Sequence, residues 1–432
     1  MTVAYHTELF GAFALWLRVR PRAPANRGSA PSEPGKDAMH PEPTTIAVSG
    51  AEFGWGSSGK LNAVLSALRN RSRTPLRFIG LASGLGRPLL ADQPVGPWHD
   101  LPDTVPELRA GVQEITRTQH VQAALVVLDG PVATALENAG VPTVFVDSLP
   151  FMWSEGDRDA LPLNATVYCA QQCLDLPPEC RDVLASVPTL RWVEAVIDTP
   201  PPVPPGRSAA ARPYRTALVS LGGLRSPYLA DWTSYPRVVV PAALAALAAH
   251  GVARAHLAGN LPAALTDRLT HHAPASLELT TGALSPSAFL SELAHCDVLL
   301  TSPGLTTLLE AGRLQVPTVC LPPQNLSQIF NGRFHAQAAG ADVRATWPDD
   351  VFSEGEALTL RAKGEDHALA LIYDGIGAAA SDGGRTAATL RDRILDALQR
   401  SAAVTDWGAL TTAVGTGGAA QVADALLEIL PA

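Results

Sequence analysis

Four residues in the stretch from Thr301 to Asn331 have the types and spacing that suit nucleotide binding. Gly304 follows a short apolar run, and Thr306 and Thr307 come next, where a new helix would leave its first N–H groups unpaired. Such a helix N-terminus attracts anions and suits a diphosphate. About one turn further on, Glu310 offers a carboxylate that can accept hydrogen bonds from ribose hydroxyls. The stretch therefore predicts a site for a nucleotide donor.

The same stretch resembles the donor-binding signature of GT-B glycosyltransferases, above all the enzyme that adds N-acetylglucosamine to lipid-linked peptidoglycan precursors. The positions that match this signature are Gly304, Thr307, Glu310, Pro317, Pro322, Gln324, Gln328 and Asn331. The resemblance implies that Glu310 binds the ribose. The neighbouring residues that it also implies in donor binding are Ser302, Thr306 and Asn325. The alternative is an ordinary strand–helix–strand unit in which Glu310 is a solvated helix residue.

A glycine pair upstream of this helix supports the same prediction. Gly222 and Gly223 follow the apolar run TALVSL and would let the backbone approach a diphosphate. Arg225, two residues further on, would add a positive charge. The pair matches the glycine loop in the C-terminal domain of the same family. A Gly-Gly pair alone is a weak signal. Its position ahead of the helix that carries Glu310 supports the prediction of a nucleotide site.

An earlier glycine-rich loop, SGAEFGWGSSGK, ends at Lys60. In the glycosyltransferase interpretation it faces the acceptor and the transferred sugar. Lys60 would neutralise a carboxylate or a phosphate there, or else it is a surface lysine on a first helical turn. Glu52 is a candidate general base, because it projects from a glycine-rich turn. The other loop residues expected at the sugar or acceptor are Gly54, Trp55 and Ser57.

The residues from Gly54 to Lys60 also spell G-x-x-x-x-G-K, the pattern of a P-loop. The next residue is Leu61, where a P-loop needs Ser or Thr to hold Mg²⁺. A P-loop protein also needs a carboxylate at the end of a neighbouring strand to hold the metal ion, and Asp129 is the only candidate. A P-loop NTPase is therefore kept as an alternative.

A second candidate base follows the apolar segment VPTVFV. Asp147 stands at the expected end of that strand, and Phe151 and Trp153 follow it closely. A carboxylate beside bulky apolar side chains suits proton transfer from a flat acceptor. An ordinary loop packed on the neighbouring domain is the alternative. Asp129 is expected to face the same cleft, because it stands equivalent to Ser302 in an internal repeat.

That repeat predicts the architecture. LVVLDGPVATALENAGVPTV, from Leu125, aligns with VLLTSPGLTTLLEAGRLQVPTV, from Val298, and each segment lies at nearly the same depth in its half. Two Rossmann-like α/β domains facing across a cleft, as in GT-B, explain this. The expected divisions are a disordered extension over 1–43, an acceptor domain over 44–198, a proline-rich linker over 199–213 and a donor domain over 214–432. Helices near 387–398 and 420–430 are expected to pack back across the cleft.

Composition excludes several classes of function. The net charge is −9 and no run of Lys and Arg is longer than two or three residues, which argues against nucleic-acid binding. The odd number of cysteines, five, predicts reduced thiols. The spacing of Cys169, Cys173 and Cys180, with no histidine close to them, argues against a metal site. No apolar run reaches the ~18 residues of a membrane span, and the N-terminal LFGAFALWL makes a poor secretory signal. We expect a cytoplasmic protein with small-molecule ligands, no cofactor beyond the co-substrate and an undetermined oligomeric state.

The chain as a whole resembles the cytosylglucuronate synthases of nucleoside antibiotic pathways. The motifs concerned are AVSGAEFGWGSSGKL, VDSLPFMW and SPGLTTLLEAG with VPTVCLPPQNLSQIFNG. The resemblance implies transfer of glucuronic acid from a UDP-sugar to cytosine. We expect inversion and no need for a metal ion, because N–H groups at a helix N-terminus can stabilise the UDP leaving group. In this transfer Asp147 or Glu52 would accept the proton, and Lys60 or Arg225 would bind the carboxylate of the sugar. A non-catalytic nucleotide-sugar-binding relative is the third alternative, beside the NTPase.

Overall fold

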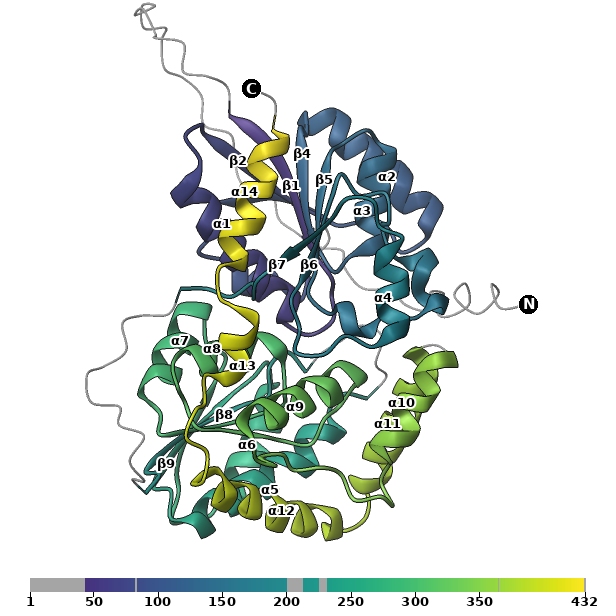
Figure 1. The fold of residues 1–432 in the computed structure, drawn as a ribbon. Helices are drawn as coiled ribbons and strands as arrows, with labels where there is room; N and C mark the ends of the chain where they lie inside the picture. The colour runs from purple at the N-terminus through teal and green to yellow at the C-terminus, as the bar shows by residue number, and fades with distance from the viewer. Residues whose placement is uncertain (1–42, 82–83, 200–212, 225–230, 364, 431–432) are drawn as a thin grey trace, which may run out of the picture.

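The computed structural model shows two α/β domains, one above the other in Figure 1. It describes residues 43–81, 84–199, 213–224, 231–363 and 365–430. Almost all of the predicted extension over 1–43, most of the predicted linker over 199–213, and Arg225 lie outside the described residues. No helix in the described part is both long and apolar enough to cross a membrane.

The N-terminal domain is built on a parallel sheet of seven strands. Its central strands are continuous apolar runs whose side chains are buried on both faces, as the inner strands of parallel sheets are. In spatial order the strands are β3 (Val95–His99), β2 (Leu76–Leu81), β1 (Thr44–Gly50), β4 (Ala123–Val127), β5 (Thr143–Asp147), β6 (Val167–Gln171) and β7 (Leu190–Val193).

Helices cover both faces of this sheet. On one face α1 (Gly56–Arg71) and α14 (Gly418–Ile429) form a core with alternate residues of the strands. On the other face lie α2 (Val105–Gln119), α3 (Gly130–Asn138) and α4 (Pro178–Ala185). The short 3-10 helices of this domain are η1 (Arg87–Leu90), η2 (Pro150–Met152) and η3 (Glu155–Ala160).

The C-terminal domain has a smaller parallel sheet of five strands. In spatial order they are β10 (Glu278–Gly282), β9 (Arg254–Ala258), β8 (Thr216–Ser220), β11 (Val298–Thr301) and β12 (Thr318–Cys320). The surrounding helices are α5 (Ser234–His250), α6 (Ala263–His271), α7 (Pro286–His295), α8 (Leu305–Arg313), α9 (Leu326–Ala339), α10 (Glu354–Leu360), η4 (Arg361–Lys363), α11 (Glu365–Ala379), α12 (Arg385–Ser401) and α13 (Ala409–Val414).

The two sheets share one topology, which accounts for the repeat in the sequence. The order β2-β1-β4-β5 in the first sheet corresponds to β9-β8-β11-β12 in the second. The aligned segments are therefore β4–α3–β5 and β11–α8–β12 in equivalent places. Since ligands of such sheets bind beyond the carboxyl ends of the strands, the loops after β1, β4, β8 and β11 are the ones to inspect.

The two terminal helices behave differently from each other. After α13, α14 runs back onto the N-terminal domain and buries Val422 and Leu426 beside α1 (Figure 1). The prediction for the helix near 387–398 was wrong. That helix, α12, stays in the C-terminal domain and packs against α5, because its apolar face, with Leu390 and Ile394, joins that domain's core.

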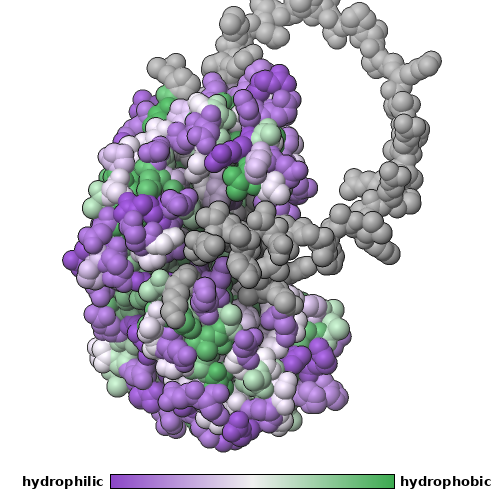
Figure 2. Space-filling view, turned by 90° about the vertical axis from the view of Figure 1, so that its right-hand side faces the viewer, coloured by the Kyte–Doolittle hydropathy of each residue, from purple (hydrophilic) through white to green (hydrophobic). Residues whose placement is uncertain are grey.

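The described surface is largely hydrophilic on the face shown in Figure 2, with only small hydrophobic patches. Among the described residues the large hydrophobic side chains that remain exposed are Val105, at 52%, and Trp192, at 44%. Burial of apolar side chains is therefore nearly complete within the two domain cores.

Candidate nucleotide site at the domain junction

The N-terminus of α8 lies where the two domains meet, a region we call the domain junction. β11 ends at Thr301, and the chain turns through Ser302 to Gly304, which is the N-cap residue of α8. Gly304 has an extended backbone and gives the helix no side-chain cap. The first N–H groups of α8 therefore remain available to an anion. Thr306 and Thr307 lie in this first turn, each half-buried.

A lysine from the other domain reaches this turn. Lys60, in α1, is only 2% exposed, and its Nζ donates a hydrogen bond to Thr306 Oγ1 at 2.5 Å. Among the described residues no carboxylate lies within ion-pair distance of this ammonium group. Burial lowers the pKa of Lys60 to about 8, while the charge of Glu310 opposes that shift. The burial of Lys60 excludes the alternative that it is a surface lysine, and the sequence gave no sign of its contact with Thr306.

Glu310 follows Thr306 by four residues, so the two share one face of α8. Its side chain is half-buried, and in the described part of the chain its carboxylate has no hydrogen-bond or ion-pair partner. Burial raises the pKa of Glu310 to about 8; the charge of Lys60 lowers it and that of Asp198 raises it. The face of α8 with Thr306 and Glu310 therefore presents hydrogen-bond donors at the helix N-terminus. One turn away it presents a carboxylate acceptor that has no partner among the described residues.

The glycine loops of the two domains meet directly beside this face. Gly54 and Gly222 have positive φ angles, +65° and +62°, which an L side chain rarely adopts. A Cβ on Gly223 would lie 2.5 Å from the backbone nitrogen of Trp55, so only glycine permits this approach. The two predicted loops thus form one surface. Ser57 is the exception, because it is buried against Gly50.

A network of buried amides supports the loop before α9. Gln324, Asn325 and Gln328 are at most 9% exposed. The side chains of Gln324 and Gln328 donate to Ser302 Oγ at 3.5 and 3.3 Å, and Asn325 caps α9 through the N–H of Gln328 at 3.0 Å. Asn331 donates to the carbonyl of Pro303 at 3.0 Å. These side chains stabilise the conformation of the loop. A direct contact with a nucleotide-sugar would require some of these hydrogen bonds to break.

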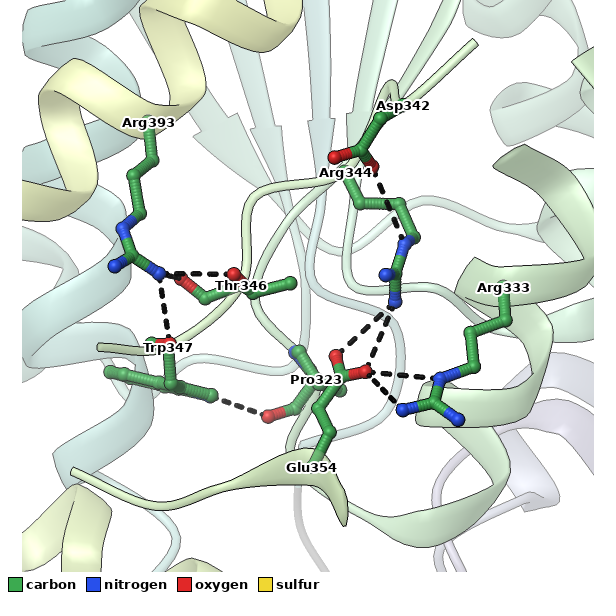
Figure 3. A network of polar contacts seen from close by, with 8 residues as sticks. All are labelled: Pro323, Arg333, Asp342, Arg344, Thr346, Trp347, Glu354 and Arg393. Atoms are coloured by element: carbon green, nitrogen blue, oxygen red, sulfur yellow. Dashed lines mark hydrogen bonds and ion pairs between the residues drawn. The ribbon is translucent and has the colours of Figure 1, made fainter. Parts of the chain in front are cut away.

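Two aromatic side chains donate hydrogen bonds to backbone carbonyls of the same loop, and Figure 3 shows the bond from Trp347 to Pro323. Trp347 Nε1 donates to the carbonyl of Pro323 at 2.6 Å, and Tyr235 donates to that of Pro322 at 2.7 Å. Arg393, in α12, holds Trp347 in turn by donating to its carbonyl at 2.9 Å. The sequence gave no signal for these residues, because none of them belongs to a motif and the contacts join distant segments.

Two carboxylates of the N-terminal domain lie at the carboxyl ends of β1 and β4. Asp129 accepts hydrogen bonds from Ser49 Oγ at 3.2 Å and from the N–H of Val132 at 3.3 Å. Burial raises its pKa to about 6, and the charge of Glu52 adds to the rise. Leu128, just before it, has φ of +60°, a conformation costly for a leucine and often found at functional sites. Glu52 accepts from the N–H of Gly84 and is otherwise half-exposed.

Asp147 is placed differently from what its motif predicted. Its side chain is fully buried and accepts hydrogen bonds from Trp153 Nε1 at 2.7 Å, Tyr168 Oη at 2.9 Å and the N–H of Leu149 at 3.0 Å. Burial raises its pKa to about 6 against these bonds. A general base must reach its substrate, so Asp147 could take that role only if these hydrogen bonds opened and the carboxylate became accessible. Trp153 is here a hydrogen-bond donor that shapes the loop.

Phe151, predicted to bind the sugar or the acceptor, packs in the core of the structure. It is fully buried in η2, and its ring packs against Phe330 and Phe334 of α9, with centroids 5.4 and 5.1 Å away. Its carbonyl accepts from Arg361 at 3.0 Å. These contacts tie the N-terminal domain to the C-terminal domain, which is the alternative that the sequence left open.

The P-loop alternative lacks its loop. α1 begins at Gly56, so most of the segment from Gly54 to Lys60 is already helical and cannot wrap a phosphate. Lys60 projects from within the helix toward α8 instead. In the described residues no group of three His, Cys, Asp or Glu side chains could hold a metal ion, and Cys169, Cys173, Cys180 and Cys320 form no disulfide.

Comparison with solved structures identifies this arrangement. MurG from Acinetobacter baumannii matches with a TM-score of 0.53 at 14% identity, over 89% of this chain and 100% of that chain. The complex of S. aureus MnaA with UDP matches with a TM-score of 0.51 at 10% identity, over 88% and 94%. The chain has the GT-B fold. The low identities limit this likeness to the fold, and no protein-family model and no curated protein matches the sequence.

Proposed function

We propose that this protein is a glycosyltransferase that uses a UDP-sugar. The observation that supports it most is the carboxylate of Glu310, which has no partner among the described residues and lies one turn beyond the N-terminus of α8 at the domain junction. A ribose binds the carboxylate and a diphosphate binds the helix N-terminus. The GT-B fold, the UDP complex of a protein with that fold and the signature around Glu310 agree with this proposal.

The transfer proceeds with inversion. A nucleophilic N–H or O–H of the acceptor attacks the anomeric carbon as the bond from that carbon to the diphosphate oxygen breaks. UDP leaves with the electron pair, and the acceptor's proton passes to a carboxylate on the opposite side. Asp129 takes this role in place of Asp147, because it is half-buried at the end of β4 and its pKa is raised to about 6. Glu52, the base predicted from sequence, lies close enough to strengthen that shift.

The sugar and the acceptor are narrower parts of the proposal. Glucuronic acid and cytosine rest on the resemblance of three motifs to cytosylglucuronate synthases. Cytosine suits the site in its chemistry, since a flat, polar acceptor can lose a proton to Asp129 as it attacks. Trp55, half-buried in the first glycine loop, is the aromatic surface that the base would contact.

A two-stage experiment tests the proposal. Thermal shift with UDP, dTDP, GDP and ATP identifies the nucleotide, and we expect UDP alone to raise the melting temperature. Mass spectrometry then follows UDP-glucuronate, UDP-glucose and UDP-N-acetylglucosamine with cytosine for UDP release and product. Stabilisation by ATP with ATP hydrolysis would replace the proposal with the NTPase. Stabilisation by UDP without turnover on any donor and acceptor would indicate the non-catalytic relative.

A further inference from the structure

Lys60 is a buried cation with no carboxylate at ion-pair distance among the described residues. An ammonium group has three N–H donors, and Lys60 has one hydrogen-bond partner in the described residues, the neutral hydroxyl of Thr306. At 2% exposure it cannot be solvated freely. Burying an unpaired charge is costly, so such a group is retained where a ligand supplies the opposite charge. The ligand expected here is an anion.

The position of the ammonium group specifies which anion. Its partner Thr306 lies in the first turn of α8, where the free N–H groups of the helix also point. Glu310 lies one turn further along the same face, about 6 Å away along the helix axis. This spacing is comparable with the separation between the hydroxyls of a ribose and the phosphates attached to its 5′ carbon. A nucleotide whose ribose contacts Glu310 would therefore place its phosphates at Lys60.

We infer that Lys60, supplied across the domain junction by the N-terminal domain, is the cation that binds the donor's diphosphate. Its bond to Thr306 occupies the ammonium group while the site is empty. The inference rests on the proposed function and extends it, because the donor site then needs both domains. A nucleotide with phosphates draws Lys60 and α8 together, whereas the nucleoside alone interacts with the C-terminal domain only.

The test compares ligands that differ only in their phosphates. Binding of UDP, UMP and uridine is measured by calorimetry, or by ligand-observed NMR for weak binding, on the full chain. Lys60→Met should weaken UDP about 10- to 100-fold, the range of a charge-assisted hydrogen bond, and leave uridine unchanged. Lys60→Gln keeps a donor for Thr306 without the charge and should behave in the same way. Lys60→Arg should retain most of the UDP affinity. Glu310→Gln, the matched control, should weaken all three ligands.

Each outcome has a separate meaning. UDP affinity that is unchanged in both neutral variants would overturn the inference and leave the proposed function standing. Equal weakening of UDP and uridine would also overturn it, because Lys60 would then only support the structure. If Lys60→Met weakens UDP-glucuronate much more than UDP, the anion is the carboxylate of the sugar and the diphosphate assignment is wrong. A wild-type protein that binds no uridine nucleotide would instead refute the proposed function itself.

Discussion

Replacement of Lys60 by Met is expected to stabilise the ligand-free protein while it weakens nucleotide binding. Burial lowers the pKa of this lysine from 10.5 to about 8, and that shift corresponds to about 3 kcal/mol of destabilisation when the group is charged in both states. The lost hydrogen bond to Thr306 offsets about 1 kcal/mol. At pH 7 the variant should therefore be more stable by about 2 kcal/mol, an order-of-magnitude figure.

The pH dependence gives this prediction a signature. Between the folded pKa of about 8 and the unfolded value of 10.5, the unfolded chain binds the proton that the folded wild type has lost. Wild-type stability therefore gains from rising pH across this window, and the advantage of Lys60→Met shrinks. Glu310 and Asp198, the charged groups that face this region, are carboxyl groups; the pKa of Glu310, about 8, lies at the lower edge of the window in the wild type.

Urea denaturation at pH 7 and pH 10, followed by tryptophan fluorescence, measures both effects. We expect a higher midpoint for Lys60→Met at pH 7 and a smaller difference at pH 10. Lys60→Arg keeps the charge and should give no gain at either pH. A variant that is less stable than wild type at pH 7, or equally stabilised at both pH values, would refute the account of Lys60 as a buried unpaired charge.

Three further predictions concern the reaction and the loop behind the donor site. Trp347→Phe removes the hydrogen bond to the carbonyl of Pro323 and should raise the KM for the UDP-sugar several-fold with little change in kcat. The control Trp192→Phe, at an exposed tryptophan, should change neither constant. Equal effects of the two substitutions would show that the loop does not depend on this hydrogen bond. For the wild type, kcat/KM should rise with pH through about 6 as Asp129 ionises and fall above about 8 as Lys60 loses its charge. Asp129→Asn should lower kcat at least 100-fold, and a rise through pH 6 that survives in this variant would place the base elsewhere. Activity should persist in excess EDTA, since Lys60 and the N-terminus of α8 supply the positive charge that stabilises UDP. If EDTA abolishes activity and Mg²⁺ restores it, this prediction is wrong.

The sequence was sufficient for the fold and for the position of the helix that carries Glu310. The repeated strand–helix–strand unit predicted two Rossmann-like domains, because buried parallel strands leave continuous apolar runs that local patterns reveal. The turn at Gly304 and the helix that carries Glu310 were also predicted locally, since the residues that indicate them lie close together along the chain. In both cases the information is contained in residues that are close along the chain.

The burial and the partners of the candidate residues depend on contacts between distant segments, which the sequence does not reveal. Asp147 and Phe151 follow a strand in the way that functional residues do, and only the fold shows that Trp153 and Tyr168 enclose the carboxylate and that α9 covers the ring. The contact between Lys60 and Thr306 joins residues 246 positions apart, so no spacing rule predicts it. Burial and partners, which decide whether a polar side chain binds a ligand or supports a loop, depend on such contacts.

The central claim, that the face of α8 bearing Glu310 binds a uridine nucleotide, is tested most directly by one titration. UDP is titrated calorimetrically into the wild type and into Glu310→Ala, with circular dichroism to show that both are folded. The account predicts measurable binding to the wild type and about 10- to 100-fold weaker binding to the variant, as expected for the loss of a charge-assisted acceptor. Equal dissociation constants for the two proteins would contradict it.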